Sequence, residues 1–290
     1  MSSVECLSEG ALYALCNVYA VDGQVTWHDP SARGFAPMNT YVLREGADAL
    51  IIDTGVSAHT AELLDQLAGI VGDADRLAVL QTRIGEYTTI CNTVPIAERF
   101  GMATIHSEQD DSPRWVDFRP AYGRDTGAAE ALAGADVKLF HVPDTIAVDA
   151  AGARILDIFH ATLRLLPTSW VYDRRTRTLF TSDSFTHVMR ADPGGPWVVD
   201  DVHDSSDVEQ MRDHLLTTRY WWLAGARLDA IRASIAETFE RHDVETIAPD
   251  FGCILHGREV VARHVEMLDE ILAQAQEMAP ASAADVAAGQ

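Results

Sequence analysis

The chain has 290 residues, of which 47% are hydrophobic, and it carries a formal net charge of −22 at pH 7. This length and apolar content are sufficient for one large core. The charge excludes nucleic acids and anionic membranes as preferred partners, because both would be repelled, and it leaves a small molecule or a basic protein.

Residues 1–9 are polar and acidic, and no apolar run reaches the about 18 residues that a membrane span needs. We therefore expect a cytoplasmic protein that has no signal peptide. Four cysteines lack the paired spacing of a metal site and are expected to be reduced thiols: Cys6, Cys16, Cys91 and Cys253.

The N-terminal half alternates between strand and helix patterns. Two β-rich runs, 38–46 and 49–52, are joined by a polar turn and followed by an Asp-Thr-Gly loop, Asp53 to Gly55. Apolar residues recur at helical spacing over 60–71, and 77–80 has the pattern of a buried strand. This order of strand, helix and strand predicts an α/β fold.

The C-terminal half continues this pattern, with strands at 168–172 and 179–185 and helices over 220–241 and about 259–276. We predict a single domain over 1–278 and a disordered tail over 279–290. Two loop segments, 107–125 and 189–207, could border a groove with Trp115 and Trp197 in its walls, but ordinary surface loop packing is slightly favoured for each.

Four segments in this order resemble the metallo-β-lactamase superfamily, and within it the flavodiiron and oxygen-binding diiron proteins. The resemblance covers about residues 35–255 and rests on Asn39 and Tyr41, the loop Asp53 to Gly55, the segment around Asp183, and Ile247 to Gly252, where the family has Ile-Ala-Pro-Ser-His-Gly. It implies an αββα sandwich of two mixed sheets flanked by helices, with a dinuclear metal centre at one edge.

The first metal-binding motif of that family is altered in this chain. The family has His-x-His-x-Asp-His, or His-x-Glu-x-Asp-His in the flavodiiron branch, whereas residues 81–92 contain no histidine. Glu86 falls on the motif aspartate if Thr82 takes the first place, and on the flavodiiron glutamate if Ile84 does. Both registers stay open.

The later ligand positions are altered too. Arg164 or Leu165 and Phe251 stand where the resemblance implies histidines, so that only Asp183 and Glu86 remain as possible ligands. Two carboxylates bind iron or zinc far more weakly than a full set with imidazoles. We therefore expect that the inherited metal site is lost and that the protein has no cofactor.

The residues at the altered site suggest other chemistry. Arg83, Glu86, Tyr87 and Asp183 offer a cation, two carboxylates and a phenol at the ends of strands, and we predict that they form an acid/base set for a small-molecule substrate. The same residues also allow an Arg83–Asp183 ion pair that simply fills the site. The expected pocket residues are Phe251, Leu165, His187, Cys91, Trp115 and Trp197.

Three hypotheses follow. A metal-independent acid/base enzyme is narrowly favoured over a non-catalytic binding or scaffolding protein with a closed pocket. The third is a hydrolase or diiron oxidoreductase with a shifted metal site that uses His160, His187 or His256. The other histidines lack ligand-like spacing and are expected at the surface or at caps: His28, His59, His106, His141, His203, His214, His242 and His264.

The aromatic run at the start of the 220–241 helix suggests an interface. We expect Trp221 or Trp222 to be in the core, with one exposed face that supports a homodimer.

Overall fold

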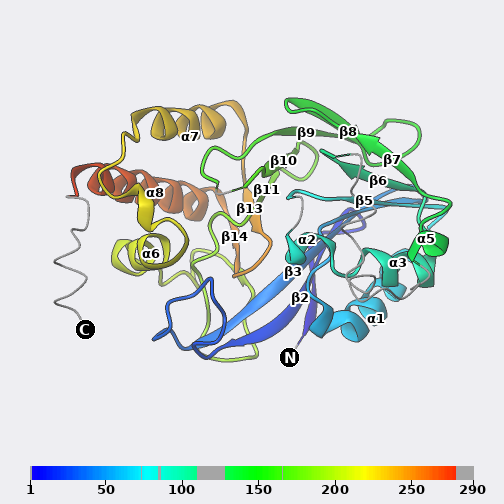
Figure 1. The fold of residues 1–290 in the computed structure, drawn as a ribbon, viewed down its shortest axis with the longest axis horizontal. Coiled ribbons are helices and arrows are strands. Elements are labelled where there is room, and N and C mark those ends of the chain that lie inside the picture. Colours follow the sequence, from blue (N-terminus) through cyan, green and yellow to red (C-terminus); the bar gives the residue numbers. More distant parts are fainter. Residues whose placement is uncertain (1, 73, 84–85, 110–127, 165, 279–290) are drawn as a thin grey trace.

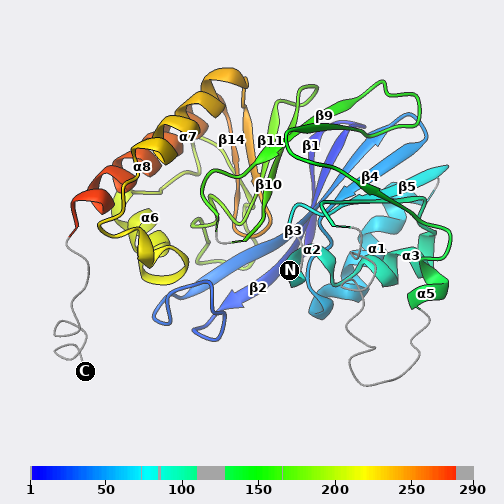
Figure 2. The ribbon, with the colours of Figure 1, turned by 45° about the horizontal axis from the view of Figure 1, so that its top comes forward.

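The computed structural model describes residues 2–72, 74–83, 86–109, 128–164 and 166–278. Two seven-stranded mixed sheets pack face to face, and helices lie on both outer faces (Figures 1 and 2). This arrangement confirms the predicted αββα sandwich. Leu165, Trp115 and the tail 279–290 lie outside the described residues. Within the described ranges, no helix is long and apolar enough to cross a membrane.

The first sheet runs in sequence order from β1 to β7, with antiparallel neighbours up to β4 and parallel neighbours from there on. Its strands are β1 (Ser3–Ser8), β2 (Leu12–Val21), β3 (Gly34–Glu45), β4 (Asp48–Ile52), β5 (Arg76–Leu80), β6 (Thr104–Ser107) and β7 (Asp136–Leu139). The strand expected at 77–80 is thereby confirmed as β5.

Short helices cover the outer face of this sheet: η1 (Ser57–His59), α1 (Thr60–Val71), α2 (Tyr87–Ile90), α3 (Thr93–Phe100) and α5 (Ala128–Ala131). The apolar spacing in α1 explains its position, because Leu63, Leu67 and Val71 fall on one side of the helix and are buried in a cluster with Ile51 and Val79 of the sheet. The helix predicted over 60–71 is confirmed to its ends.

The second sheet has the order β12-β14-β13-β11-β10-β9-β8. Its strands are β8 (Asp144–Ala147), β9 (Ile155–His160), β10 (Ser169–Asp173), β11 (Thr178–Ser182), β12 (Val198–Val199), β13 (Thr246–Pro249) and β14 (Ile254–His256). Its outer face is covered by α6 (Val208–His214), α7 (Asp229–Arg241) and α8 (Arg258–Glu277), which confirms the last predicted helix.

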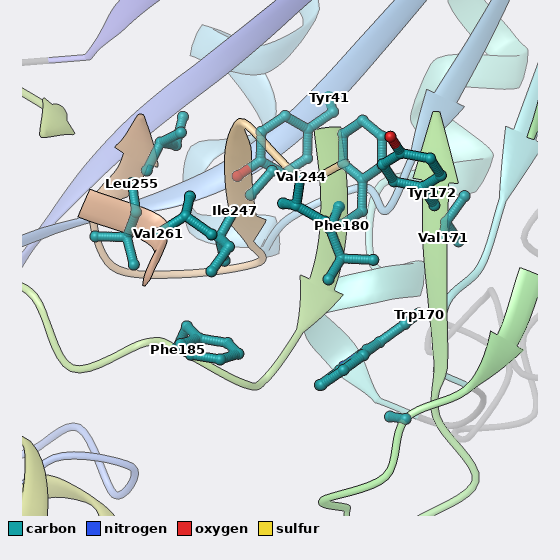
Figure 3. Packing of buried hydrophobic residues seen from close by; sticks show 14 of the residues in the cluster. Tyr41, Trp170, Val171, Tyr172, Phe180, Phe185, Val244, Ile247, Leu255 and Val261 are labelled. Carbon is teal, nitrogen blue, oxygen red and sulfur yellow. The ribbon is translucent and has the colours of Figure 1, made fainter. Parts of the chain in front are cut away.

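The core between the sheets is rich in aromatic residues (Figure 3). Tyr41 of β3 meets Phe180 of β11 edge-on, with 5.1 Å between ring centroids. Trp170 of β10 is fully buried on the other, helix-covered face of the second sheet, where it packs with Phe159 and Phe185, and Trp197 is 2% exposed in the same large cluster. Trp197 therefore packs in the core, whereas the sequence had suggested the wall of a groove.

The helix predicted over 220–241 begins later than expected, at Asp229. The preceding chain forms a π-helical turn, η3 (Leu215–Arg219), and a 3₁₀ turn, η4 (Trp221–Leu223). Tyr220 between them is buried, whereas Trp221 and Trp222 are 67% and 40% exposed. The expectation of a core tryptophan here is wrong, because Tyr220 takes the inward position. The homodimer stays a prediction.

Candidate functional site

Four polar residues meet where strands of the two sheets end. Asp53 follows β4, Arg83 lies just beyond β5, Asp183 follows β11, and Asp250 follows β13. Asp53 has a φ of 57°, and Ser182, directly before Asp183, has a φ of 49°. Positive φ is costly for residues other than glycine and often marks a functional site. The backbone is therefore strained at two of these strand ends.

Asp183 is the centre of the cluster, and its side chain is fully buried. Its Oδ2 atom accepts hydrogen bonds from Arg83 Nη1 and from Arg219 Nη2, both at 2.8 Å, and from the Tyr220 hydroxyl at 3.4 Å. Arg219 comes from the π-helical turn η3. It was not identified from the sequence, because nothing in the local pattern distinguishes an arginine that binds a distant carboxylate from one at the surface. The predicted Arg83–Asp183 ion pair is therefore present, and a second arginine extends it.

Glu86 and Tyr87 lie at the rim of this cluster. Glu86 Oε2 is 3.4 Å from Arg83 Nη1, and its side chain is 16% exposed. Burial raises the pKa of the Tyr87 phenol to about 12, so this group is neutral at pH 7. The structure brings Arg83, Glu86 and Asp183 together, while the Tyr87 ring is exposed and packs against Trp27.

Two further carboxyl groups lie beneath the arginines. Asp250 Oδ2 accepts a hydrogen bond from the Thr88 hydroxyl at 3.0 Å, and both Asp53 oxygens accept from Thr82. Burial, and then the negative charges of Asp183 and Asp53, raise the pKa of Asp250 to about 8. Burial raises the pKa of Asp53 to about 7, against the hydrogen bonds from Thr82. Both carboxyls therefore titrate near neutral pH.

Aromatic rings close the cluster from outside. Trp27, in the loop between β2 and β3, lies 5.3 Å from Phe251 and 5.6 Å from Tyr87 between ring centroids. Its indole nitrogen donates to the Tyr19 hydroxyl at 3.1 Å. Arg219 stacks over Phe251 with its guanidinium carbon 5.9 Å from the ring centre. Phe251, predicted for the pocket, is thus 1% exposed under a cover of aromatic side chains.

A cavity of about 20 Å³ adjoins Asp183 and is lined in part by Trp170, His187, His214 and Tyr220. That volume holds about one water molecule. Small-molecule pockets are usually ~300 Å³ or larger. In this conformation the cavity beside Asp183 is therefore too small for an organic ligand.

A buried histidine chain leads away from this cavity. His264 Nε2 lies 3.1 Å from an oxygen of Asp204, and His264 Nδ1 lies 3.0 Å from His187 Nε2. Because a carboxylate only accepts, His264 must donate from Nε2, and His187 must donate to His264. Burial lowers the pKa of both imidazoles, so both are neutral at pH 7. His187 therefore lines the cavity as part of a neutral hydrogen-bonded chain.

The surface position predicted for several histidines is wrong. His28, His106 and His264 are 3%, 7% and 0% exposed. Burial of these imidazoles comes from tertiary packing, and for His264 the partners Asp204 and His187 lie far away along the chain. Cys91 is half-buried after α2, and burial raises the pKa of its thiol, which makes it a poor nucleophile.

The donor set does not fit the dinuclear metal centre that the resemblance implies. Among the described residues, no group of three or more His, Cys, Asp or Glu side chains is arranged to hold a metal ion. Asp183 already binds two guanidinium groups, whose positive charge would repel a dication. His160 and His256 are the last residues of β9 and β14. Neither belongs to a group that could hold a metal ion among the described residues.

Comparison with known protein families and with curated proteins gave no match. Solved structures do match in fold. Rubredoxin oxygen:oxidoreductase from Desulfovibrio gigas is 15% identical, with a TM-score of 0.68, over 94% of this chain and 62% of that one. The flavodiiron protein from Giardia intestinalis is 14% identical, with a TM-score of 0.64, over 93% of this chain and 59% of that one.

A fragment of a diflavin flavoprotein from Nostoc, described as putative, is 15% identical, with a TM-score of 0.59 and 95% coverage of both chains. The chain thus has the metallo-β-lactamase-like fold of the flavodiiron proteins. It spans about three fifths of the length of the Desulfovibrio and Giardia proteins, at 62% and 59%. At these identities the likeness concerns the fold alone.

Proposed function

We propose that this protein is a non-catalytic binding or scaffolding protein on a metallo-β-lactamase-like fold, in which two arginines have replaced metal ions as the counter-charges of the inherited site. The observation that carries this proposal is the fully buried Asp183 carboxylate, held by Arg83 and Arg219 at 2.8 Å each. A base or nucleophile must reach a substrate, and this carboxylate is enclosed.

The charges support the same conclusion. Near neutral pH, Asp250 is largely protonated because its pKa is about 8, so the two guanidinium charges face Asp183 and a partly ionised Asp53. The cluster is then close to electrically balanced without a metal ion. Losing the metals while keeping Asp183 would leave a buried unpaired charge, and the arginines prevent that cost.

A metal-independent acid/base enzyme is the second candidate. It is favoured by Asp183 Oδ1 and Asp250 Oδ1, which are buried and have no hydrogen-bond partner among the described residues. Together with the near-neutral pKa of Asp250, such atoms are typical of a site that binds something more. This function requires the aromatic cover at Trp27 and Phe251 to open.

Thermal and denaturant unfolding of Asp183→Ala separates the two candidates. If the cluster is a closed structural core, the substitution removes the carboxylate that both guanidinium groups bind, leaves Arg83 with only its longer contact to Glu86, and costs about 3–5 kcal/mol of unfolding free energy. The matched control is Glu237→Ala, which removes one partner of an exposed ion pair with Arg241 and should cost less than about 1 kcal/mol. An unchanged or higher melting temperature for Asp183→Ala would overturn the proposal and favour the enzyme.

A further inference from the structure

A second polar cluster lies on neighbouring strands of the first sheet, from Arg76 at the start of β5 to His106, which pairs with Leu80 at the end of that strand. Arg76, His106 and Lys138 line a pocket of about 300 Å³. They come from three adjacent parallel strands, β5, β6 and β7, and His106 pairs directly with Lys138 in the register. The pocket shares no lining residue with the cavity at Asp183, so it is independent of the function proposed above.

The charges of this pocket contrast with those of the whole chain. The net charge is −22, and Lys138 is the single lysine of the sequence. Arg76 donates to the Thr104 hydroxyl at 3.1 Å. Within the described ranges, no carboxylate forms an ion pair with Arg76 or Lys138, although arginines elsewhere in the chain often have one. Arg76 and Lys138 therefore have no carboxylate partner in the described part of the chain, although Asp144 and Asp149 also line the pocket.

The two aspartates in the pocket wall are directed to the backbone. Asp144 accepts from the amides of His141 and Thr145 at 3.3 and 2.7 Å. Asp149 accepts from the amides of Ala153 and Arg154 at 3.1 and 3.0 Å. Both carboxylates therefore accept hydrogen bonds from backbone amides.

His106 gives an independent indication of a ligand. It is 7% exposed, it lines the pocket, and its Nε2 atom is buried with no hydrogen-bond partner among the described residues. Burial, and then the charges of Lys138 and Arg76, lower the pKa of His106 to about 4, against the attraction of Asp136. The imidazole is therefore neutral at pH 7 and able to donate one hydrogen bond.

The remaining wall is apolar, with Phe140 and Ile146 from the two sheets buried beside it. We propose that this pocket binds a small organic anion, with its phosphate or carboxylate head at Arg76, His106 and Lys138 and its apolar body against Phe140. Arginine and lysine are the usual partners of such head groups, and the volume is at the lower end of ligand pockets.

The single lysine allows a direct test on the full chain. Reductive ¹³C-methylation of the amines keeps the charge of Lys138 and gives one lysine signal in a ¹H–¹³C spectrum. We expect that signal to shift saturably with phenyl phosphate or benzoate, and less with inorganic phosphate, whereas phenol should leave it unchanged. A stronger response to phenyl phosphate than to benzoate would identify a phosphate head, and the reverse a carboxylate.

Arg76→Met should raise the dissociation constant of the better probe about tenfold, the loss expected for one charge-assisted hydrogen bond. His106→Phe should also weaken binding, while Arg99→Met, which removes a cation on α3 that pairs with Asp65, should not. Circular dichroism would confirm folding of each variant. The proposal is overturned if no anion shifts the Lys138 signal at millimolar concentration, or if Arg76→Met and Arg99→Met bind the probe equally.

Discussion

Two buried arginine–aspartate clusters in this chain differ in how completely their hydrogen bonds are made. Arg154 and Asp173 form an ion pair with side chains 1% and 0% exposed. Arg154 also donates to the carbonyls of Ala11 and Arg44 at 2.8 and 3.0 Å, and Asp173 accepts from the amide of Arg175 at 3.1 Å. This pair ties a turn of the second sheet to strands of the first.

The cluster around Asp183 is equally buried but less complete. Within the part of the chain that the structure describes, Asp183 Oδ1, Arg83 Nε, Arg219 Nε and Asp250 Oδ1 have no hydrogen-bond partner. Native structural networks rarely leave such atoms unpaired. The Arg154 pair thus has the complete hydrogen bonding of a structural network and the Asp183 cluster does not, a difference that the proposed replacement of metal ions by arginines would explain.

The largest expected effect comes from making the Arg154–Asp173 pair apolar. Arg154→Met with Asp173→Leu removes the Arg154 donor from the Arg44 carbonyl and the Asp173 acceptor from the Arg175 amide and the Thr176 hydroxyl, and each buried group left without a partner costs about 1–3 kcal/mol. We therefore expect a loss of several kcal/mol in unfolding free energy, measured by denaturant titration.

The same exchange at the inherited site should behave differently. Arg83→Met, Asp183→Leu and Arg219→Met together remove three of the four unpaired atoms, and they take the partner from the Tyr220 hydroxyl and from the partly exposed Glu86. Replacing a buried ion cluster by apolar residues is often neutral or stabilising by about 1–4 kcal/mol. Equal losses in the two multiple variants would show that the clusters do not differ in this way.

The next effect concerns pH and Asp250. Its folded pKa of about 8 is above that of an unfolded aspartate, about 3.9, so the folded state holds this proton more tightly. Its contribution to stability is full below pH 4 and is lost as pH rises through about 8. Asp250→Asn should remove this dependence and gain on the order of 1–3 kcal/mol over the parent between pH 5 and pH 9.

The asparagine side chain keeps an oxygen that accepts a hydrogen bond from Thr88. Because the pKa of Asp53 is also raised, to about 7, the unfolding free energy of the variant should still fall with pH, but less steeply than that of the parent. Asp65→Asn, at an exposed ion pair, serves as the control for the change in net charge. Identical pH profiles for the parent and Asp250→Asn would mean that Asp250 is ionised in the folded protein across this range.

Most of the fold followed from local patterns in the sequence. The helix at 60–71 and the strand at 77–80 have unbroken periodic apolar positions, and the structure has them at α1 and β5. The 220–241 helix was misplaced at its start, because Tyr220, Trp221 and Trp222 are apolar enough to extend the pattern. Tyr220 is the buried ring of the three, and the hydrogen bond of its hydroxyl to Asp183 is a tertiary contact that the local sequence does not reveal.

The site was predictable as far as the aligned motifs reached. Arg83, Glu86 and Asp183 lie at motif positions, and they meet in the structure. Arg219 and the chain from Asp204 through His264 to His187 were missed, since their partners lie 36 to 77 residues away with no spacing rule to link them. Long-range side-chain contacts of this kind are fixed by packing.

The smallest expected effect is at the rim, where Glu86→Gln tests whether the cluster extends to that residue. Arg83 Nη1 lies 2.8 Å from Asp183 but 3.4 Å from Glu86, whose side chain is 16% exposed and therefore partly screened by water. We expect a loss below about 1 kcal/mol in unfolding free energy, and smaller still in high salt. A loss as large as that of Asp183→Ala would place Glu86 inside the closed core. A gain in stability would instead indicate that the carboxylate is kept for function at some cost, as in an active site, and would favour the enzymatic hypothesis over the closed one.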